Sequence, residues 1–233
     1  MNRIQLLGFD RLGEKGQDGI RYAWKCDGYT YLLESAAFKN KTKGLQSKIS
    51  GYTTSVSLGC ILKYMGVACK FCRTGRMLPF STFLSAKEIA KQNVLMVLLD
   101  MKSKDKESWQ KEREFAYMGQ GEPGYSYTQL RQAIKITDCV LQKLGQNTYR
   151  HIISTSGIDE MLMALAHDLE THYFETRVTV HYSLHGTRWR SKVMPINMLY
   201  PYEYSLELLK KISAIIDEKI CLGVLLLNGF CPD

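Results

Sequence analysis

The sequence lacks the features that mark membrane-spanning and secreted proteins. No apolar run approaches the roughly 20 residues that a transmembrane helix needs. The first residues contain no signal-peptide apolar core, and low-complexity tracts and Pro- or Gly-rich linkers are also missing. We therefore expect no membrane association and a reducing, cytoplasmic location, where a cysteine cluster favours metal binding or catalysis over disulfides.

The composition is that of a globular protein with a sizeable core. The chain has 233 residues, 45% of them hydrophobic, and a formal net charge of +8. This length suits one large α/β domain or two small ones. The positive charge favours an anionic partner, although solubility alone also explains such a value. The sequence predicts a β-rich N-terminal segment at residues 1–51 and a second unit at residues 52–233.

Hairpin and turn signals occur within the first 51 residues. The strand-like runs 22–26 and 29–33 flank the pair Asp27-Gly28, which is typical of a hairpin turn. Basic residues at 39–43 and at Lys48 follow this hairpin. These lysines indicate either a solvated turn or a phosphate-contacting patch for RNA.

From residue 52 onward, helix-like and strand-like segments alternate. Ser85 and Glu88 form a capping box at the start of one helix. The apolar residues that mark four helices are Ala90, Val94, Val97, Leu98 and Met101; Leu130, Ile134, Leu141 and Leu144; Met161, Leu162, Leu165 and Leu169; and Leu206, Leu209, Ile212 and Ile216. Strands are expected at 114–118, 151–153, 177–182 and 220–227. The alternation predicts an α/β fold, a partial TIM-like (β/α) barrel of about five units with a small N-terminal hairpin segment.

Small and polar residues follow the predicted strands. These residues are Gly121-Glu122, Ser154 and Ser183-Leu184-His185. In α/β barrels the carboxyl ends of the strands line the active site, so we expect these residues to meet on one face. Each motif alone also fits a turn with a helix cap.

A cysteine cluster precedes these strands. Cys60, Cys69 and Cys72 form a C-x-x-C pair with a third thiol nearby. Thiolates bind iron and zinc strongly, and three of them leave one metal position open, as in catalytic sites. A zinc site completed by His181 or His185 is the alternative.

Two further stretches resemble known binding patterns. Residues 119–124 match the dinucleotide fingerprint G-x-G-x-x-G, but Glu122 would oppose a pyrophosphate and Pro123 would disturb the glycine turn. The run 188–190, Arg-Trp-Arg, fits either an RNA clamp or a solvated loop. His151, His167 and His172 have no evident partner in the sequence, so ordinary structural or surface roles are expected for them.

Together these stretches resemble the radical S-adenosylmethionine (SAM) enzymes, specifically the ribosomal RNA adenine methyltransferases of RlmN/Cfr type. The matching stretches are residues 56–60, 69–75, 118–123, 153–157, 183–185 and 194–197, in the family's order and at similar intervals. The resemblance covers about residues 20–233. It implies the radical SAM type of partial barrel.

The resemblance also implies a set of cofactor-binding residues. Cys60, Cys69 and Cys72 would hold three irons of a 4Fe-4S cluster, whose fourth iron chelates SAM before reductive cleavage to a 5′-deoxyadenosyl radical. The residues expected to lie along SAM are Gly119, Gly121, Glu122, Ser154, Ser183, Leu184 and His185, with Glu122 accepting a hydrogen bond from the amino group. The implied partners are ribosomal RNA or tRNA and an electron donor such as flavodoxin or ferredoxin.

The sequence departs from the family pattern at several places. The cysteine spacing is C-x8-C-x2-C where the family has C-x3-C-x2-C, a lengthening that a loop can absorb. Thr53 stands where the family has one of two methyl-shuttling cysteines, and Cys221 and Cys231 match no motif for the other. Three functions therefore stay open: a radical SAM enzyme acting on RNA, one acting on a peptide or small metabolite, and a truncated non-catalytic remnant.

Overall fold

A single large sheet organises the computed structural model, which describes residues 3–12, 19–39, 49–102, 112–225. Its strand order is β1-β2-β3-β4-β7-β8-β9-β10, and β5 pairs with β6 in a separate two-stranded sheet. The strands are β1 (Ile4–Leu12), β2 (Gly19–Cys26), β3 (Leu33–Lys39), β4 (Ile49–Thr53), β5 (Ser57–Leu58), β6 (Thr82–Phe83), β7 (Glu112–Tyr117), β8 (Thr148–Thr155), β9 (Val178–Ser183) and β10 (Cys221–Gly223).

The central part of the sheet is parallel. Strands β4, β7, β8, β9 and β10 pair in parallel, while β1, β2 and β3 pair antiparallel and join the sheet through β4. The predicted partial barrel of about five parallel strands with an N-terminal β segment is confirmed. The expected boundary at residues 51 and 52 falls inside β4, and the division into two units stays a prediction.

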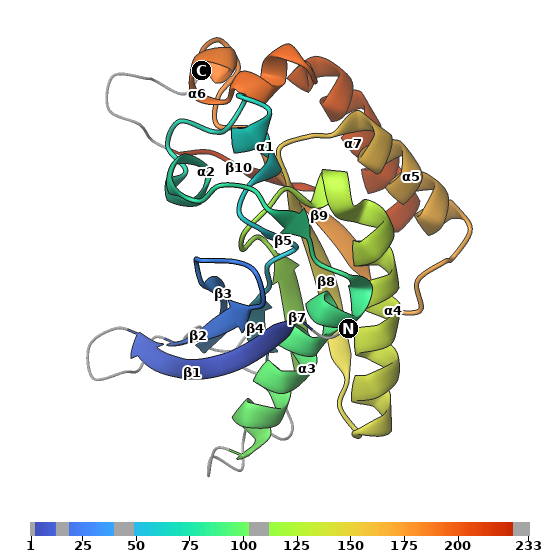
Figure 1. Cartoon of the computed structure of the whole chain (residues 1–233). Helices are drawn as coiled ribbons and strands as arrows, with labels where there is room; N and C mark the ends of the chain where they lie inside the picture. Colours follow the sequence, from blue (N-terminus) through green and yellow to red (C-terminus); the bar gives the residue numbers. More distant parts are fainter. Residues whose placement is uncertain (1–2, 13–18, 40–48, 103–111, 226–233) are drawn as a thin grey trace.

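Helices connect the parallel strands. They are α1 (Ile61–Tyr64), α2 (Arg73–Met77), α3 (Ala86–Lys102), α4 (Tyr127–Lys143), α5 (Asp159–Glu170), α6 (Arg190–Val193) and α7 (Tyr202–Ile216), with 3-10 turns η4 (Pro123–Ser126) and η5 (Pro195–Met198). Figure 1 shows α3, α4, α5 and α7 along one side of the sheet and α1, α2 and α6 near the carboxyl ends of the strands. Among the described residues no helix is long and apolar enough to cross a membrane.

Two strand predictions were wrong in their bounds. Asp27 and Gly28 do turn the chain after β2, but β3 begins at Leu33 and pairs it with Trp24, so the connection is longer than a tight hairpin. The last strand, predicted at 220–227, is described only as β10 with three residues. β10 ends the strand order, and Leu222 on it is 47% exposed, as expected for an open edge. Most of the basic run at 39–43, together with Lys48, lies outside the described residues.

The predicted helices are present, and most of the apolar residues that marked them are buried. In α4 and α5 the buried residues include Leu130, Ile134, Leu141, Met161, Leu162 and Leu165. The face of α3 differs from the prediction, because Gln92 and Asn93 are fully buried whereas Val94 and Leu98 are only half-buried. Gln92 bonds both backbone groups of Ser55, which explains why a polar residue occupies the core side of this helix.

His151 has buried partners that the sequence did not reveal. Its Nδ1 lies 2.9 Å from the Tyr117 hydroxyl and its Nε2 lies 2.9 Å from Asp138 Oδ1. The ring stacks on Phe115 and Tyr117. The imidazole therefore joins β7, β8 and α4 under the sheet, which is a structural role as expected.

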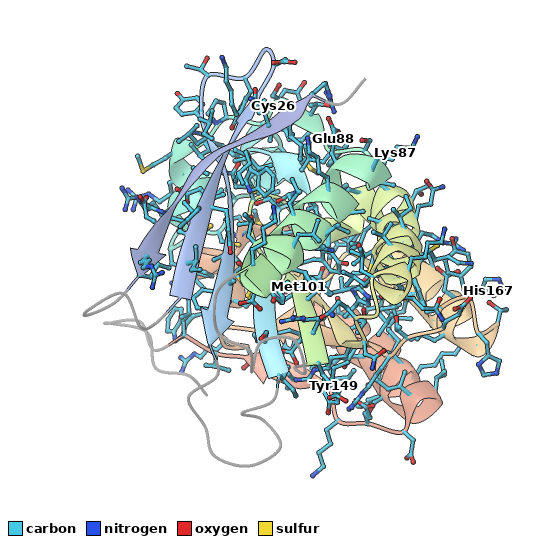
Figure 2. All side chains as sticks on the ribbon, turned by 90° about the horizontal axis from the view of Figure 1, so that it is seen from below. Cys26, Lys87, Glu88, Met101, Tyr149 and His167 are labelled. Atoms are coloured by element: carbon cyan, nitrogen blue, oxygen red, sulfur yellow. The ribbon has the colours of Figure 1, made fainter. Side chains whose placement is uncertain are left out.

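The start of α3 is fixed by Glu88. The predicted capping box is confirmed, since the Ser85 backbone N–H donates to Glu88 Oε2 at 2.8 Å and the Glu88 N–H donates to Ser85 Oγ at 3.4 Å. Arg3, immediately before β1, adds an ion pair to Glu88 at 3.0 Å. Figure 2 shows Glu88 beside Cys26 at this end of the helix, with Met101 at the other end. The carboxylate thus attaches α3 to the N-terminal strands.

The contacts of Glu88 predict a pH-dependent contribution to stability. Burial alone would raise the pKa of Glu88, but hydrogen bonds from Arg3 and Ser85 outweigh it and lower the pKa from 4.5 to about 2. A carboxylate with a depressed folded-state pKa stabilises the fold above its unfolded pKa, and this stability is lost as the pH falls through the folded pKa. We expect E88Q to lose about 1 to 2 kcal/mol at pH 7. In urea titrations this loss should shrink between pH 4.5 and pH 2.

The exposed Glu207 provides the control. It pairs with Lys210 at 2.7 Å, with both side chains mostly in solvent. Such pairs contribute little, so E207Q should change the free energy of unfolding by less than about 0.5 kcal/mol at any pH. A pH-independent difference between E88Q and the parent protein would contradict the account of Glu88.

Candidate functional site

The segment that carries the three cysteines is closed at its base by the small sheet. β5 pairs with β6, and two further backbone bonds flank the pair, from Ser81 to Leu58 and from Leu84 to Val56. The two ends of the segment 58–81 are therefore hydrogen-bonded to each other, beside the carboxyl ends of the parallel strands. We call residues 58–81 the cysteine loop.

The first two cysteines are separated by one helical turn. The gap between Cys60 and Cys69 contains α1, and Gly66 reverses the chain with a φ of +75°. The Val67 N–H then donates to the Leu62 carbonyl at 2.8 Å. The long spacing is thus absorbed as compact structure, with Leu62 buried in the core.

The three thiols and Glu122 interact electrostatically. Cys60 is buried at the start of α1, and Cys69 and Cys72 are half-buried, with Cys72 at the start of α2. Burial raises the pKa of the Cys69 thiol to about 12, and the negative charges of Cys72, Glu122 and Cys60 add to this rise. Burial also raises the pKa of Cys60, with Glu122 and Cys72 contributing. The structure therefore places all four groups in one electrostatic neighbourhood.

Hydrogen-bond donors already face two of these sulfurs. The Gly75 backbone N–H donates to Cys72 Sγ at 3.3 Å. The backbone N–H groups of Leu62 and Lys63 lower the pKa of Cys60 and oppose part of the effect of burial. Such donors stabilise thiolates, the form of cysteine that binds metals.

Glu122 joins the loops that follow β7 and β8. Its carboxylate is 5% exposed and accepts four hydrogen bonds. The donors are Thr155 Oγ1 at 2.6 Å, the Ser156 N–H at 2.9 Å, Ser156 Oγ at 2.7 Å and the Gly124 N–H at 3.1 Å. Two of these donors are hydroxyls, which can rotate toward another acceptor. A ligand amine can therefore donate to this carboxylate only if the Thr155 or Ser156 hydroxyl rotates away from it.

Gly119 and Gly121 allow the Glu122 loop to pack against the segment that leads to Cys60. A Cβ on Gly119 would lie 2.4 Å from Ser55 Oγ, and one on Gly121 would lie 2.2 Å from Ser57 Oγ. Gly121 also has a φ of +103°. The close approach that these glycines permit is thus to protein, and their expected approach to SAM stays a prediction.

The other predicted residues lie at the carboxyl ends of β8 and β9: Ser154 and Ser183 are within the strands, and Leu184 and His185 follow β9. Ser154 is paired in register with His181, and its hydroxyl is buried without a hydrogen-bond partner among the described residues. Ser183 and Leu184 are half-buried at the end of β9. An unpartnered buried hydroxyl at a strand end is a donor and acceptor available to a ligand.

His185 contacts the cysteine loop directly. Its ring meets Phe71 edge-on at 4.7 Å, and its Nδ1 accepts from the Leu225 N–H at 3.1 Å. Burial lowers the pKa of His185 to about 4, with Arg190 and His181 contributing. The imidazole is therefore neutral at pH 7, and because Nδ1 accepts, Nε2 carries the proton and is a donor.

Arg190 is a residue of this site that the sequence did not identify. It was expected in an RNA clamp or a solvated loop, but its side chain is fully buried, so both expectations are wrong for this residue. Its guanidinium bonds the carbonyls of Ser156, Ser183 and Leu184 and the side chain of Asn197. The nearest sequence motif is the Pro-Ile-Asn stretch that begins at Pro195, five residues after Arg190. That motif does not indicate that the arginine side chain is buried.

The donor chemistry of the three cysteines is compatible with an iron–sulfur cluster, whose presence stays a prediction. Among the residues that the structure describes, no group of three or more His, Cys, Asp or Glu side chains could hold one metal ion. This gives no support to the zinc alternative with His181 or His185. In a four-iron cluster each thiolate binds a different iron, so the three sulfurs stand apart around it. Three thiols with hydrogen-bond donors suit such a group.

Comparison with known proteins gives related sequences and a related structure. The chain is 32% identical over 213 residues to the "Probable dual-specificity RNA methyltransferase RlmN" of Petrotoga mobilis, covering 88% of this chain and 55% of that protein. It is 29% identical over 229 residues to the "Dual-specificity RNA methyltransferase RlmN" of Wolinella succinogenes, covering 94% of this chain and 59% of that protein. No protein-family model matches the chain.

A solved structure shares the fold. The crystal structure of a radical SAM methyltransferase from Sphaerobacter thermophilus superposes with a TM-score of 0.76 at 20% identity, over 98% of this chain and 60% of that one. The chain thus spans 55% to 60% of the length of these three proteins. At this identity the likeness shows the fold alone.

The packing of Gly119 predicts a specific loss on substitution. G119A would push the Glu122 loop away from Ser55, so we expect a loss of about 1 to 3 kcal/mol in the free energy of unfolding. Alkylation of the buried Cys60 should also become faster. G8A is the control, because Gly8 lies in β1 with no heavy atom within 4 Å of its added Cβ and no positive φ. Equal Cys60 protection in both variants, measured by iodoacetamide labelling and mass spectrometry, would refute this packing role.

Proposed function

We propose, from the resemblance of this chain to the RlmN-type radical SAM RNA methyltransferases, that it is a radical SAM enzyme. In this proposal Cys60, Cys69 and Cys72 bind a 4Fe-4S cluster, and SAM binds beside it at the carboxyl ends of the strands. The observation that carries the proposal is the contact of the cysteine loop with the segments after β9, through Phe71 against His185 at 4.7 Å and the Lys70 N–H to the Val193 carbonyl at 2.9 Å. The proposed location is cytoplasmic.

The chain's own residues would bind and orient SAM. The bound cluster supplies the electron for reductive cleavage of the sulfonium. Ser154 Oγ offers an unpartnered buried hydroxyl, and His185 Nε2 offers a neutral donor. Glu122 holds the loops after β7 and β8 together and would share its charge with the amino group of SAM. Burial of the site would protect a reactive intermediate from water.

The proposed substrate is RNA, most directly ribosomal RNA or tRNA. The names of the related proteins and the net charge of +8 support this substrate class. Near the site, Lys192 lies 4.1 Å from the centre of the Trp189 ring, and Arg188 lies 5.2 Å from it. An aromatic ring with two cations beside it suits contact with a base and phosphates. A reduced flavodoxin or ferredoxin is the proposed electron donor.

Thr53 favours a second candidate. It ends β4, at the residue where the resemblance places one methyl-shuttling cysteine, and its side chain has no thiol to carry a methyl group. SAM cleavage followed by chemistry on a peptide or small metabolite would need the cluster but not that cysteine. A non-catalytic remnant would need neither.

Removal of the proposed ligands should abolish cluster binding. After anaerobic reconstitution with iron and sulfide, the parent protein should show cluster absorbance and, with dithionite and SAM, release 5′-deoxyadenosine. C69A and C72A should each lose this product by at least about 100-fold, because a cluster with fewer thiolates is not held. C139A is the control, since Cys139 is exposed on α4. No product from the parent protein, or product that persists in C69A, would overturn the proposed function.

RNA binding separates the two enzyme candidates. Filter binding of ribosomal RNA should weaken steeply between 50 and 200 mM salt, by roughly tenfold or more if several phosphates are contacted. W189A should weaken binding further without reducing cluster content, and K210A on the exposed face of α7 should behave like the parent. If SAM is cleaved but RNA binding is weak and insensitive to W189A, a peptide or small metabolite is the better substrate class.

A further inference from the structure

Arg190 is a buried cation at the centre of the site with no ion pair among the described residues. The side chain is fully buried, and its guanidinium lies 5.0 Å from the centre of the Tyr182 ring. Its direct partners are uncharged: backbone carbonyls, the Asn197 amide oxygen and the Met194 sulfur at 3.1 Å. Burying a charge without a paired carboxylate is costly, and the five fixed N–H donors of arginine are suited to offset this cost.

The guanidinium connects the loops after β8 and β9. Its Nη2 donates to the Ser156 carbonyl at 2.7 Å. Its Nη1 donates to the Ser183 carbonyl at 2.5 Å and also to the Leu184 carbonyl. The three carbonyls belong to the stretches that carry the proposed SAM contacts. Arg190 therefore fixes the backbone from which these side chains project.

Ser156 links Arg190 to Glu122. The N–H and hydroxyl of Ser156 both donate to Glu122 Oε2, at 2.9 and 2.7 Å, while the carbonyl of Ser156 accepts from Arg190. One residue thus bridges a buried anion and a buried cation. Through it, the loop after β7 is joined to the loops after β8 and β9.

The segment that carries Arg190 also holds the cysteine loop. The Lys70 N–H, between Cys69 and Cys72, donates to the Val193 carbonyl of α6 at 2.9 Å. Asn197 accepts from Arg190 Nε at 2.9 Å and from the Tyr202 N–H at 3.0 Å, which fixes this segment to the start of α7. The positive charge of Arg190 acts on Cys69 and opposes the effect of burial there.

We propose that Arg190 is a positioning residue that holds the SAM-binding loops and the cysteine loop in one arrangement and places a positive charge beside the cluster. This inference rests on the proposed function. It has two parts. The N–H donors of the guanidinium position the loops, and its positive charge changes the electrostatic potential at the cluster. Lysine keeps the charge but cannot reach carbonyls on two loops at once, and methionine keeps neither.

The experiment compares R190K and R190M with the parent protein after anaerobic reconstitution. SAM affinity is measured by equilibrium dialysis, and the midpoint potential of the cluster is measured by redox titration followed by electron paramagnetic resonance. We expect both variants to bind SAM at least about tenfold more weakly. R190M should also have a lower midpoint potential, since loss of a nearby cation disfavours the more negative reduced state, whereas R190K should stay near the parent value.

Arg113 provides a matched control for buried arginines. It too is fully buried, but it bonds Tyr52, Asp100 and Gln146 near the start of β7, at the opposite end of the strand from the site. R113K should lower the melting temperature yet leave SAM affinity and midpoint potential unchanged. Equal effects of R113K and R190K on SAM affinity would mean that Arg190 acts only through general stability, and the inference would fall.

The outcomes separate this inference from the proposed function. If the parent protein assembles no cluster and binds no SAM, the proposed function fails. If the parent binds both and the Arg190 variants bind SAM equally well, only the inference about Arg190 fails. Should the Arg190 variants not fold, N197A removes one anchor of the guanidinium, and SAM affinity at the parent level in N197A would overturn the inference.

Discussion

The buried Glu122 carboxylate and the buried Arg190 guanidinium, joined through Ser156, are the interactions on which the candidate site depends. The carboxylate collects four donors from its own loop and the loop after β8, and the guanidinium collects carbonyls from the loops after β8 and β9. Within the described part of the chain neither charge is in contact with a counter-ion, so each is stabilised by backbone and side-chain polar groups that must be held in place. Burial lowers the pKa of Arg190, and the negative charge of Glu122 opposes this effect. Loss of either would free a loop that carries proposed ligand contacts.

The parallel sheet makes this convergence possible. The strands β4, β7, β8 and β9 run in one direction, so that the loops at their carboxyl ends share an edge with the cysteine loop, which the small β5–β6 sheet closes. Behind the sheet, Arg113 and His151 bind α3 and α4 to the strands through buried hydrogen bonds. The core contacts thus fix the positions of the strands, and Glu122 and Arg190 fix the positions of the loops at the strand ends.

The sequence predicted what depends on local pattern and missed what depends on distant partners. The capping box at Ser85 and the order of helices and strands follow from spacing alone, and the expected strand-end residues do lie at the strand ends. Arg190 was missed because its carbonyl partners come from loops that only the folded sheet brings together. The partners of Glu122 in Thr155 and Ser156 were missed for the same reason. The length of the connection after Asp27 could not be predicted either, because it depends on the pairing register of β2 and β3, which strand propensity does not determine.

In the proposed function, the cluster and SAM bind side by side at the carboxyl ends of the parallel strands. The most direct test is electron–nuclear double resonance on the reduced, reconstituted protein with SAM labelled by nitrogen-15 in the amino group and oxygen-17 in the carboxylate. We expect hyperfine couplings from both labels, because SAM would chelate the iron that no cysteine binds. A spectrum without such couplings, in protein that holds an intact cluster and binds SAM, would contradict the account.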